Sequence, residues 1–121
     1  MSTLTIQRRM TQEFIAEDPV TIALIPSVAV LQSSGNKKRF DGPPRAPQEF
    51  KLIPMTFDQR PTVTVDGVDR IISYTLLGVH NAVMELWDHW VDGEDTYVII
   101  AFAPGYGYEK KGLVERRLPG G

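Results

Sequence analysis

Cysteine is missing from the sequence, so neither a disulfide framework nor a thiolate metal site is possible. Long apolar runs are missing as well, since none approaches the roughly 18–20 residues of a membrane span. The N-terminal residues carry Arg8 and Arg9 without the apolar stretch of a signal peptide. Positive charge is not in excess, because the formal net charge is −2, whereas proteins that bind duplex DNA usually carry a basic excess. We therefore expect a protein without a membrane partner, made in a reducing cytoplasm and carried out of the cell only by an assembly.

Reactive groups are also sparse. No serine lies in a Gly-x-Ser-x-Gly turn, and Gly105-x-Gly107 lacks the remaining positions of a phosphate-binding loop. Four potential metal ligands lie close together in the sequence: His80, Glu85, Asp88 and His89. Their spacing matches no metal-binding motif. The acidic residues around Gly93 are typical of a solvated turn. The sequence therefore predicts no catalytic residue, no metal site and no cofactor, and thus a protein that is not an enzyme.

The chain is long enough for one domain with one hydrophobic core, spanning residues 1–121, of which 42% are hydrophobic. Residues 4–17 are predicted to form a short helix, because apolar residues recur there about every four positions. This apolar stripe consists of Ile6, Met10, Phe14 and Ile15. We expect it to pack against a β-rich body, either that of the same chain or that of a neighbouring copy.

After Val20 the apolar residues alternate, which is typical of strands. The Asp66-Gly67 pair lies between two alternating stretches and predicts a β-hairpin with a type I′ turn. Residues 79–90 fit either a helix or a short strand, and residues 96–103 form the most apolar strand. About six short strands at roughly 8–12-residue spacing indicate an antiparallel barrel or sandwich. We predict a mainly β fold: a small antiparallel β-barrel with a short N-terminal α-helix and a long projecting loop.

The least regular segment is residues 33–48, SSGNKKRFDGPPRAPQ, which combines two glycines, three prolines and four basic residues. At about 16 residues it is longer than most connections in a compact domain. It is either a solvated charge run or a proline-stiffened arm that meets a polyanion or a neighbouring subunit, and we favour the arm. The residues that we assign to this contact are Lys37, Lys38, Arg39, Phe40 and Arg45.

Four aromatic residues are candidates for a subunit or partner interface: Trp87, Trp90, Tyr106 and Tyr108. Tryptophan is enriched at the centres of protein interfaces. The alternative is that at least one of the two tryptophans closes the end of the barrel. The two tyrosines flank a glycine in an expected surface loop, where they face either a partner or solvent.

The order of these features resembles that of the head-to-tail stopper, or head-closure, proteins of long-tailed phages, in particular phages that infect actinobacteria. Two passages carry most of the resemblance, which extends over nearly the whole chain. One is DGPPRAPQEFKLIP, where a loop leads into a strand, and the other is residues 86–98, with Asp88, Trp90, Asp92-Gly93 and Tyr97. Related sequences often have glycine just before the first aspartate, where this chain has Trp87. This departure leaves the tightness of that turn open.

The resemblance implies a structural virion protein that assembles in the host bacterial cytoplasm and forms a ring in the phage neck. Such a homo-oligomeric ring, of about six or twelve copies, lies between the portal and head-to-tail adaptor above and the tail terminator and tail tube below. A loop of each subunit reaches into the channel, contacts the packaged genomic DNA and retains it until ejection. On this chain the candidate channel gate is the segment 33–48.

Three other functions remain open at this stage. The first is a tail terminator or minor tail protein with a similar barrel. The second is a small ligand-binding or hydrolytic β-barrel, which needs a pocket with converging polar groups. The third is a nucleic-acid-binding barrel of the OB type, which the acidic net charge disfavours.

Overall fold

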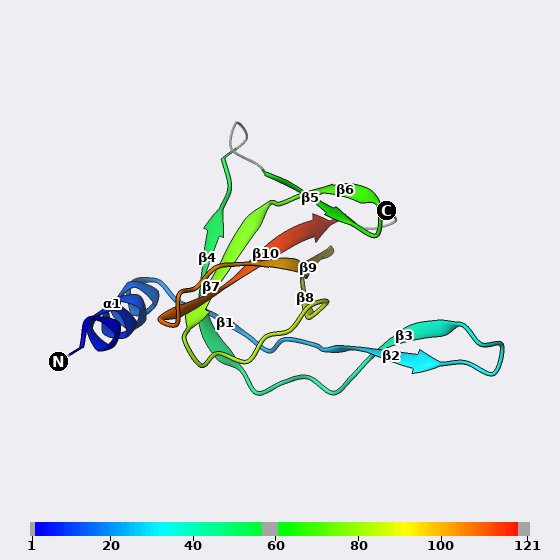
Figure 1. The fold of residues 1–121 in the computed structure, drawn as a ribbon, viewed down its shortest axis with the longest axis horizontal. Helices are drawn as coiled ribbons and strands as arrows, with labels where there is room; N and C mark the ends of the chain where they lie inside the picture. The colour runs from blue at the N-terminus through cyan, green and yellow to red at the C-terminus, as the bar shows by residue number, and fades with distance from the viewer. Residues whose placement is uncertain (1, 57–60, 119–121) are drawn as a thin grey trace.

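The computed structural model describes residues 2–56 and 61–118. Within these ranges the chain forms one helix, α1 (Thr3–Glu17), followed by ten strands. Figure 1 shows α1 at one end of the molecule, the strands in the middle and a long hairpin at the other end. In the described residues no helix is both long enough and apolar enough to cross a membrane.

Six strands form one antiparallel sheet that curls into a barrel. In spatial order they are β1 (Val20–Ile22), β4 (Gln48–Pro54), β7 (Tyr74–Val79), β10 (Glu109–Arg117), β9 (Asp95–Ala103) and β8 (His89–Asp92). The other four strands form two separate hairpins: β2 (Ser27–Leu31) with β3 (Lys37–Asp41), and β5 (Thr62–Val65) with β6 (Val68–Ile71).

The two edges of the six-stranded sheet meet just after β1. Ile25 donates a backbone hydrogen bond of 2.8 Å to the carbonyl of His89 on β8 and accepts one of 3.0 Å from its N–H. The barrel is therefore nearly closed, and the predicted mainly β, barrel-like fold with one N-terminal helix is confirmed. We call this meeting of the two edges the seam.

The barrel interior is filled by large apolar side chains without contact to solvent, among them Phe50, Leu76 and Ile99. On β9, however, three consecutive residues are buried, which a strand with one solvent-facing side would not show. The reason is the β5–β6 hairpin, which covers the outside of the sheet. Its Val63 and Val65 pack against a second cluster, formed by Ile72, Val98 and Ile100.

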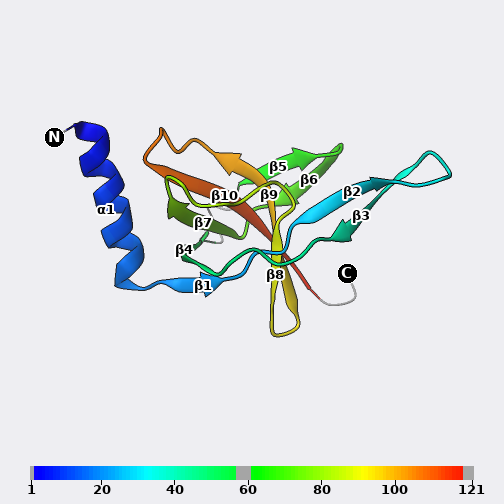
Figure 2. The ribbon, with the colours of Figure 1, turned by 90° about the horizontal axis from the view of Figure 1, so that it is seen from below.

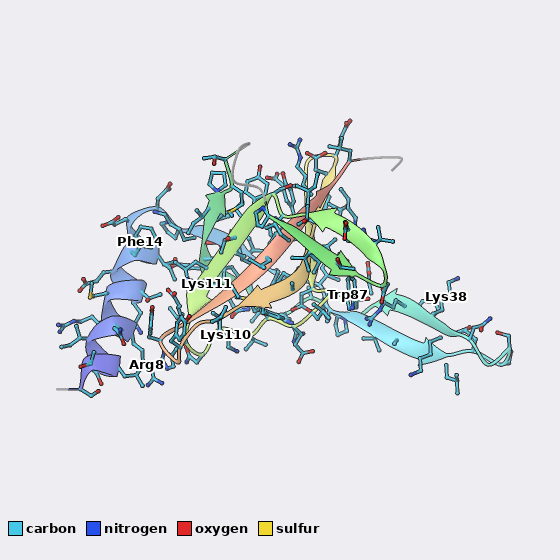
Figure 3. The ribbon with its side chains drawn as sticks, turned by 45° about the horizontal axis from the view of Figure 1, so that its top comes forward. Arg8, Phe14, Lys38, Trp87, Lys110 and Lys111 are labelled. Atoms are coloured by element: carbon cyan, nitrogen blue, oxygen red, sulfur yellow. The ribbon has the colours of Figure 1, made fainter. Side chains whose placement is uncertain are left out.

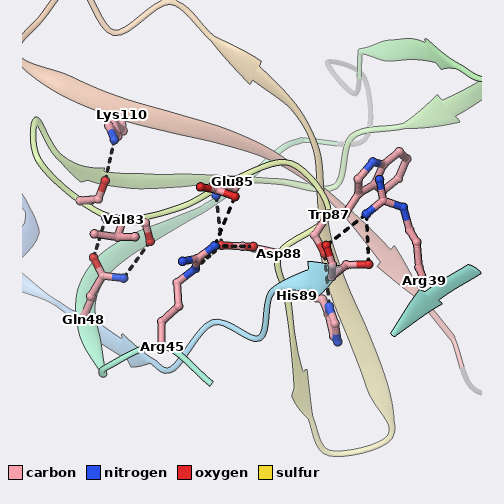
Figure 4. Close-up of polar contacts among 11 residues, drawn as sticks. Arg39, Arg45, Gln48, Val83, Glu85, Trp87, Asp88, His89 and Lys110 are labelled. Carbon is pink, nitrogen blue, oxygen red and sulfur yellow. Dashed lines mark hydrogen bonds and ion pairs between the residues drawn. The ribbon is translucent and has the colours of Figure 1, made fainter. Parts of the chain in front are cut away.

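The β5–β6 hairpin has the turn that its sequence predicts. Asp66 and Gly67 have φ angles of 51° and 77°, and two positive values in succession are the signature of a type I′ turn. This prediction is confirmed. Of the residues that fit either a helix or a strand, Val79 ends β7, residues 80–88 form neither, and β8 begins at His89. Side chains hold that segment instead, as Gln48 does through two hydrogen bonds to the backbone of Val83 (Figure 4).

Helix α1 begins one residue before the predicted start and ends where expected, capped by Ser2, whose hydroxyl accepts a 3.1 Å bond from the N–H of Thr5. It packs on β4 and β7 of its own chain. The face that it buries contains Thr11 and Ile15. Ile6, Met10 and Phe14 are exposed, so packing of these three side chains on the body of the same chain is wrong as a prediction, while their packing on a neighbouring copy stays a prediction.

Candidate interaction surface

The predicted long loop is a hairpin over much of its length. Its residues Lys37–Asp41 form β3, which pairs with β2 from Ser27↔Asp41 to Leu31↔Lys37. The connecting turn is closed by hydrogen bonds between Gln32 and Asn36 and between Gly35 and Gln32. The loop prediction is therefore wrong for these residues, because Val28 and Val30 offer a strand with which the basic stretch pairs. We call residues 27–41 the arm; Figures 1 and 2 show it extending away from the barrel, opposite α1.

One face of the arm is apolar. Val28 lies opposite Phe40, and Val30 lies opposite Lys38, so the four side chains share one side of the hairpin. All four are exposed. The ammonium group of Lys38 lies 5.6 Å from the centre of the Phe40 ring, where it keeps its charge in water while its stem covers apolar surface. Two-stranded hairpins are marginally stable in water without a surface to pack on, so an uncovered apolar face on one is unusual.

Polar contacts fasten the base of the arm to the barrel. The guanidinium of Arg39 stacks 5.5 Å from the centre of the Trp87 ring and donates a 3.1 Å hydrogen bond to the carbonyl of Ser27 (Figure 4). Asp41 approaches His89 at the seam with a 3.1 Å Oδ1–Nε2 distance. Arg39 is thus engaged within its own chain. All four predicted contact residues on strand β3 are exposed, but Arg39 also holds the base of the arm, which leaves Lys37, Lys38 and Phe40 for a contact outside the subunit.

Arg45 lies beyond the arm and has a different task. Its guanidinium donates two hydrogen bonds, of 2.8 and 3.2 Å, to the carboxylate of Asp88, which is fully buried beside the seam (Figure 4). The hydrogen bond to Asp88 raises the pKa of Arg45 above its ordinary value. The backbone of Arg45 is held as well, by a 2.8 Å bond to the carbonyl of Leu24. Its assignment to a projecting channel loop is wrong, because the buried carboxylate needs this cation.

The two tryptophans of the resemblance region differ in role. Trp90 is a core residue, 8% exposed, and its ring stacks on that of Tyr97 at a centroid distance of 5.1 Å. The prediction that Trp90 forms an interface is therefore wrong for this chain, and the alternative that one tryptophan closes the barrel is right. Trp87 is half-buried and packs at the edge of the cluster that contains Val98.

The backbone at Trp87 is in the left-handed region, with a φ of 72°. Bulky residues rarely adopt this conformation, whereas glycine does so without cost. The turn before Asp88 is therefore tight, although a tryptophan rather than a glycine stands in it. The Trp87 N–H bonds to the carbonyl of Ile99 at 2.8 Å, and its ring receives Arg39, so surrounding contacts hold the strained residue in place.

The two tyrosines lie at the end of the barrel that α1 covers. Tyr106 is 74% exposed, and its ring lies 6.4 Å from that of the partly buried Tyr108. Between them, the carbonyl of Gly107 accepts a 3.1 Å hydrogen bond from Arg8 of the helix. The predicted partner role of Tyr106 and Tyr108 stays a prediction.

A second apolar surface, which the sequence did not identify as such, is the outer stripe of α1. It consists of Ile6, Met10 and Phe14, of which Met10 is 61% exposed. The Nζ of Lys51 lies 4.5 Å from the centre of the Phe14 ring. Figure 3 places Phe14 and Lys38 at opposite ends of the molecule. The sequence showed that these apolar residues recur at helical spacing, but it did not show that they face away from the barrel.

The residues weighed for chemistry do not converge. In residues 2–56 and 61–118, no three His, Asp or Glu side chains are close enough together to hold a metal ion. A groove of about 410 Å³ lies at the base of the arm, lined by Arg39, Asp41, Trp87, His89 and Arg117 among others. Several of its charged groups pair within the chain, as Asp41 does with His89 and Arg117 with Glu115.

Comparison of this chain with models of known protein families, with curated proteins and with solved structures finds no match.

Proposed function

We propose that this protein is a head-to-tail stopper, a non-enzymatic virion subunit that forms a ring in the neck of a tailed phage. The observation that carries the proposal is the division of the chain into a nearly closed, filled barrel and an arm that projects from it with an uncovered apolar face. A barrel whose interior is packed by Phe50, Leu76 and Ile99 is built as a support rather than as a ligand container. A projecting arm is built to reach something outside the subunit.

The residues on which the resemblance rests lend further support, because several of them meet at one place. Asp88 and Trp90 come from one passage and Arg45 from the other, and they join at the seam and in the core beside it. Tyr97 stacks on Trp90. Residues that are far apart in the sequence thus stabilise the same part of the barrel, as expected of residues that define a fold.

In the proposed ring, the tip of the arm faces the channel. Lys37 and Lys38 lie near the tip and are exposed, so copies of the arm around an axis would present repeated positive charge to DNA phosphates. The chain carries a formal net charge of −2, so this local charge supports a contact confined to the channel rather than general affinity for DNA. The ring would retain packaged DNA below the portal and adaptor and offer its lower side to the tail.

The experiment that tests the proposal is a phage that lacks this chain. We expect heads that package DNA and then lose it, together with complete tails that stay unattached, as seen by electron microscopy. Loss of a tail terminator would instead leave DNA-filled heads stable and give tails of irregular length. A cryo-image of the complete particle should place the chain in a ring between capsid and tail, and any other location would refute the proposal.

The gate can be tested separately from the ring. The variant Lys37→Gln keeps the hairpin and removes a charge near its tip, on the face away from Val28 and Phe40. We expect particles that assemble normally but release more DNA to an added nuclease. Glu94→Gln, exposed in the turn between β8 and β9, is the control for removal of an exposed charge. Particles as leakproof as the parent would show that Lys37 does not close the channel, whatever the fate of the ring.

A further inference from the structure

The arm carries an apolar face that needs a cover. Val28, Val30 and Phe40 are between 42% and 47% exposed, and they are neighbours on a hairpin that leaves the barrel. A contiguous exposed apolar surface marks an interaction site. Phosphates of DNA would be attracted to the lysines of the arm but gain nothing from these three side chains. The cover must therefore be another apolar surface.

Helix α1 offers such a surface. Ile6, Met10 and Phe14 are exposed along it, while the face with Thr11 and Ile15 fixes the helix to its own barrel. The helix thus has two apolar sides, of which one is in use. An exposed stripe at a spacing of four residues is suited to receive the flat side of a hairpin or another helix.

The charges beside the two surfaces are mainly opposite in sign. Glu13 and Glu17 are exposed next to Met10 and Phe14 in the C-terminal half of the helix, with the exposed Arg9 one turn before Glu13. On the arm, Lys38 is exposed on the apolar face itself, whereas Lys37 is exposed on the opposite face, across from Leu31. Apolar contact and charge pairing would therefore act together if the arm lay on the helix, while two arms laid against each other would bring like charges together.

The two surfaces lie at opposite ends of the molecule, as Figures 1 and 2 show. One chain cannot bring them together, but the arm of one copy can reach the helix of the next. A contact between two different patches repeats from copy to copy and closes into a ring when the rotation permits. This is the type of contact that the proposed neck ring requires.

We infer that the arm of each copy docks with its Val28, Val30 and Phe40 face on the Ile6, Met10 and Phe14 stripe of the adjacent copy. The inference rests on the proposed ring and names the joint that holds it together. Lys37, on the opposite face of the arm, stays outside the joint and is free to contact DNA. The occupant of both surfaces is a second copy of this chain.

The absence of cysteine permits a direct test by disulfide cross-linking. One protein carries Val30→Cys on the arm, and the other carries Met10→Cys on α1; both positions are exposed, so both variants should fold. After mixing and mild oxidation we expect a disulfide-linked dimer of one copy of each, seen by electrophoresis without reducing agent. Val91→Cys, exposed on β8, replaces Met10→Cys in the control mixture and should give little product.

Several outcomes would overturn the inference. Dimers of Val30→Cys with itself would show that arm packs on arm. A mixture that cross-links no more than the control, or a parent chain that stays monomeric in sedimentation at about 1 mM, would show that the joint does not exist. Protection of the Val30→Cys thiol from a thiol reagent by duplex DNA, and not by a second copy, would assign the arm face to DNA.

A charge exchange tests the same joint by a second route. Lys38→Glu, or Glu13→Lys combined with Glu17→Lys, should weaken self-association by about tenfold, and a mixture of the two variants should recover it. Glu94→Lys, exposed in the turn between β8 and β9, is the control and should have little effect. Failure of the mixture to recover association would contradict the pairing. The two proposals can fail separately. If the arm and the helix cross-link but the protein is found outside the neck, only the proposed function is refuted. If the protein forms the neck ring but its copies are joined arm to arm, only this inference is refuted.

Discussion

Two hairpins leave the barrel of this protein, and they behave in opposite ways. The β5–β6 hairpin turns back onto the sheet, where Val63 and Val65 pack on the second hydrophobic cluster and Arg70 pairs with Glu115 at 3.0 Å. The β2–β3 arm continues away from the sheet and leaves its valines exposed. Both are antiparallel pairs of short strands. The difference shows that a hairpin becomes part of the core or part of the surface according to the face that it meets.

The face that β5–β6 meets is the apolar outer side of β9, with Val98 and Ile100. The arm begins after the seam, where the polar contacts of Arg39, Asp41 and His89 hold only its base. Hydrophobic burial therefore acts on one hairpin within the subunit. On the other, burial is available only from a partner.

The largest expected difference in stability is between substitutions of Arg45 and of Lys38, two residues that the sequence analysis assigned to one loop. Arg45→Ala leaves the buried Asp88 carboxylate without its cation, so we expect the free energy of unfolding to fall by about 3 kcal/mol. Lys38→Ala on the arm should change it by less than about 0.5 kcal/mol. Urea denaturation of both variants measures the difference, and equal effects would contradict the separation of seam and arm.

A matched pair of valines compares the hairpins directly. Val65→Ala removes two methyl groups that pack on the second cluster and should cost about 1 kcal/mol of stability. Val30→Ala makes the same change on the exposed face of the arm and should cost less than about 0.5 kcal/mol in the monomer. Thermal unfolding at low protein concentration is the measurement. A costly Val30→Ala in the monomer would mean that the arm packs on its own barrel.

The β5–β6 hairpin should also respond to pH through Glu115. Burial raises the pKa of this carboxyl, but hydrogen bonds from Arg117 and Arg70 outweigh burial and lower it overall. The stabilisation is therefore fully present above the pKa of an unfolded glutamate, about 4.3, and is lost as the pH falls through the lower folded value. We expect the ionised Glu115 to contribute up to about 1 kcal/mol to the free energy of unfolding. Glu115→Gln should remove this part of the acid dependence, and an unchanged profile would contradict it.

The smallest effect should concern the base of the arm. Arg39→Gln removes the stacking on Trp87, which is worth about 0.5–1 kcal/mol at an exposed site. We expect the backbone amides of β2 and β3 to exchange hydrogen faster, while those of β7 and β9 exchange as before. Mass-spectrometric hydrogen exchange resolves the two regions. Faster exchange throughout the barrel would show that Arg39 supports the whole fold rather than the arm.

Local signals were sufficient for several elements. The helix, the type I′ turn at Asp66-Gly67 and the apolar strand near residue 100 depend on neighbours in the sequence, and each lies where it was predicted. The roles of Arg45 and Trp90 were missed because their partners, Asp88 and Tyr97, come from other strands or from far along the chain. Composition marked residues 33–48 as unusual, but it did not distinguish a loop from a strand that pairs with Val28 and Val30.

The sequence by itself thus determined a mainly β chain with one N-terminal helix and an unusual basic segment, because periodicity and turn chemistry act over a few residues. Tertiary structure decided which side of α1 faces the barrel, which tryptophan enters the core and which cation neutralises Asp88. It also decided that one hairpin is covered and the other is not. These outcomes depend on the closure of the sheet between Ile25 and His89, since burial and charge pairing arise only when distant segments meet.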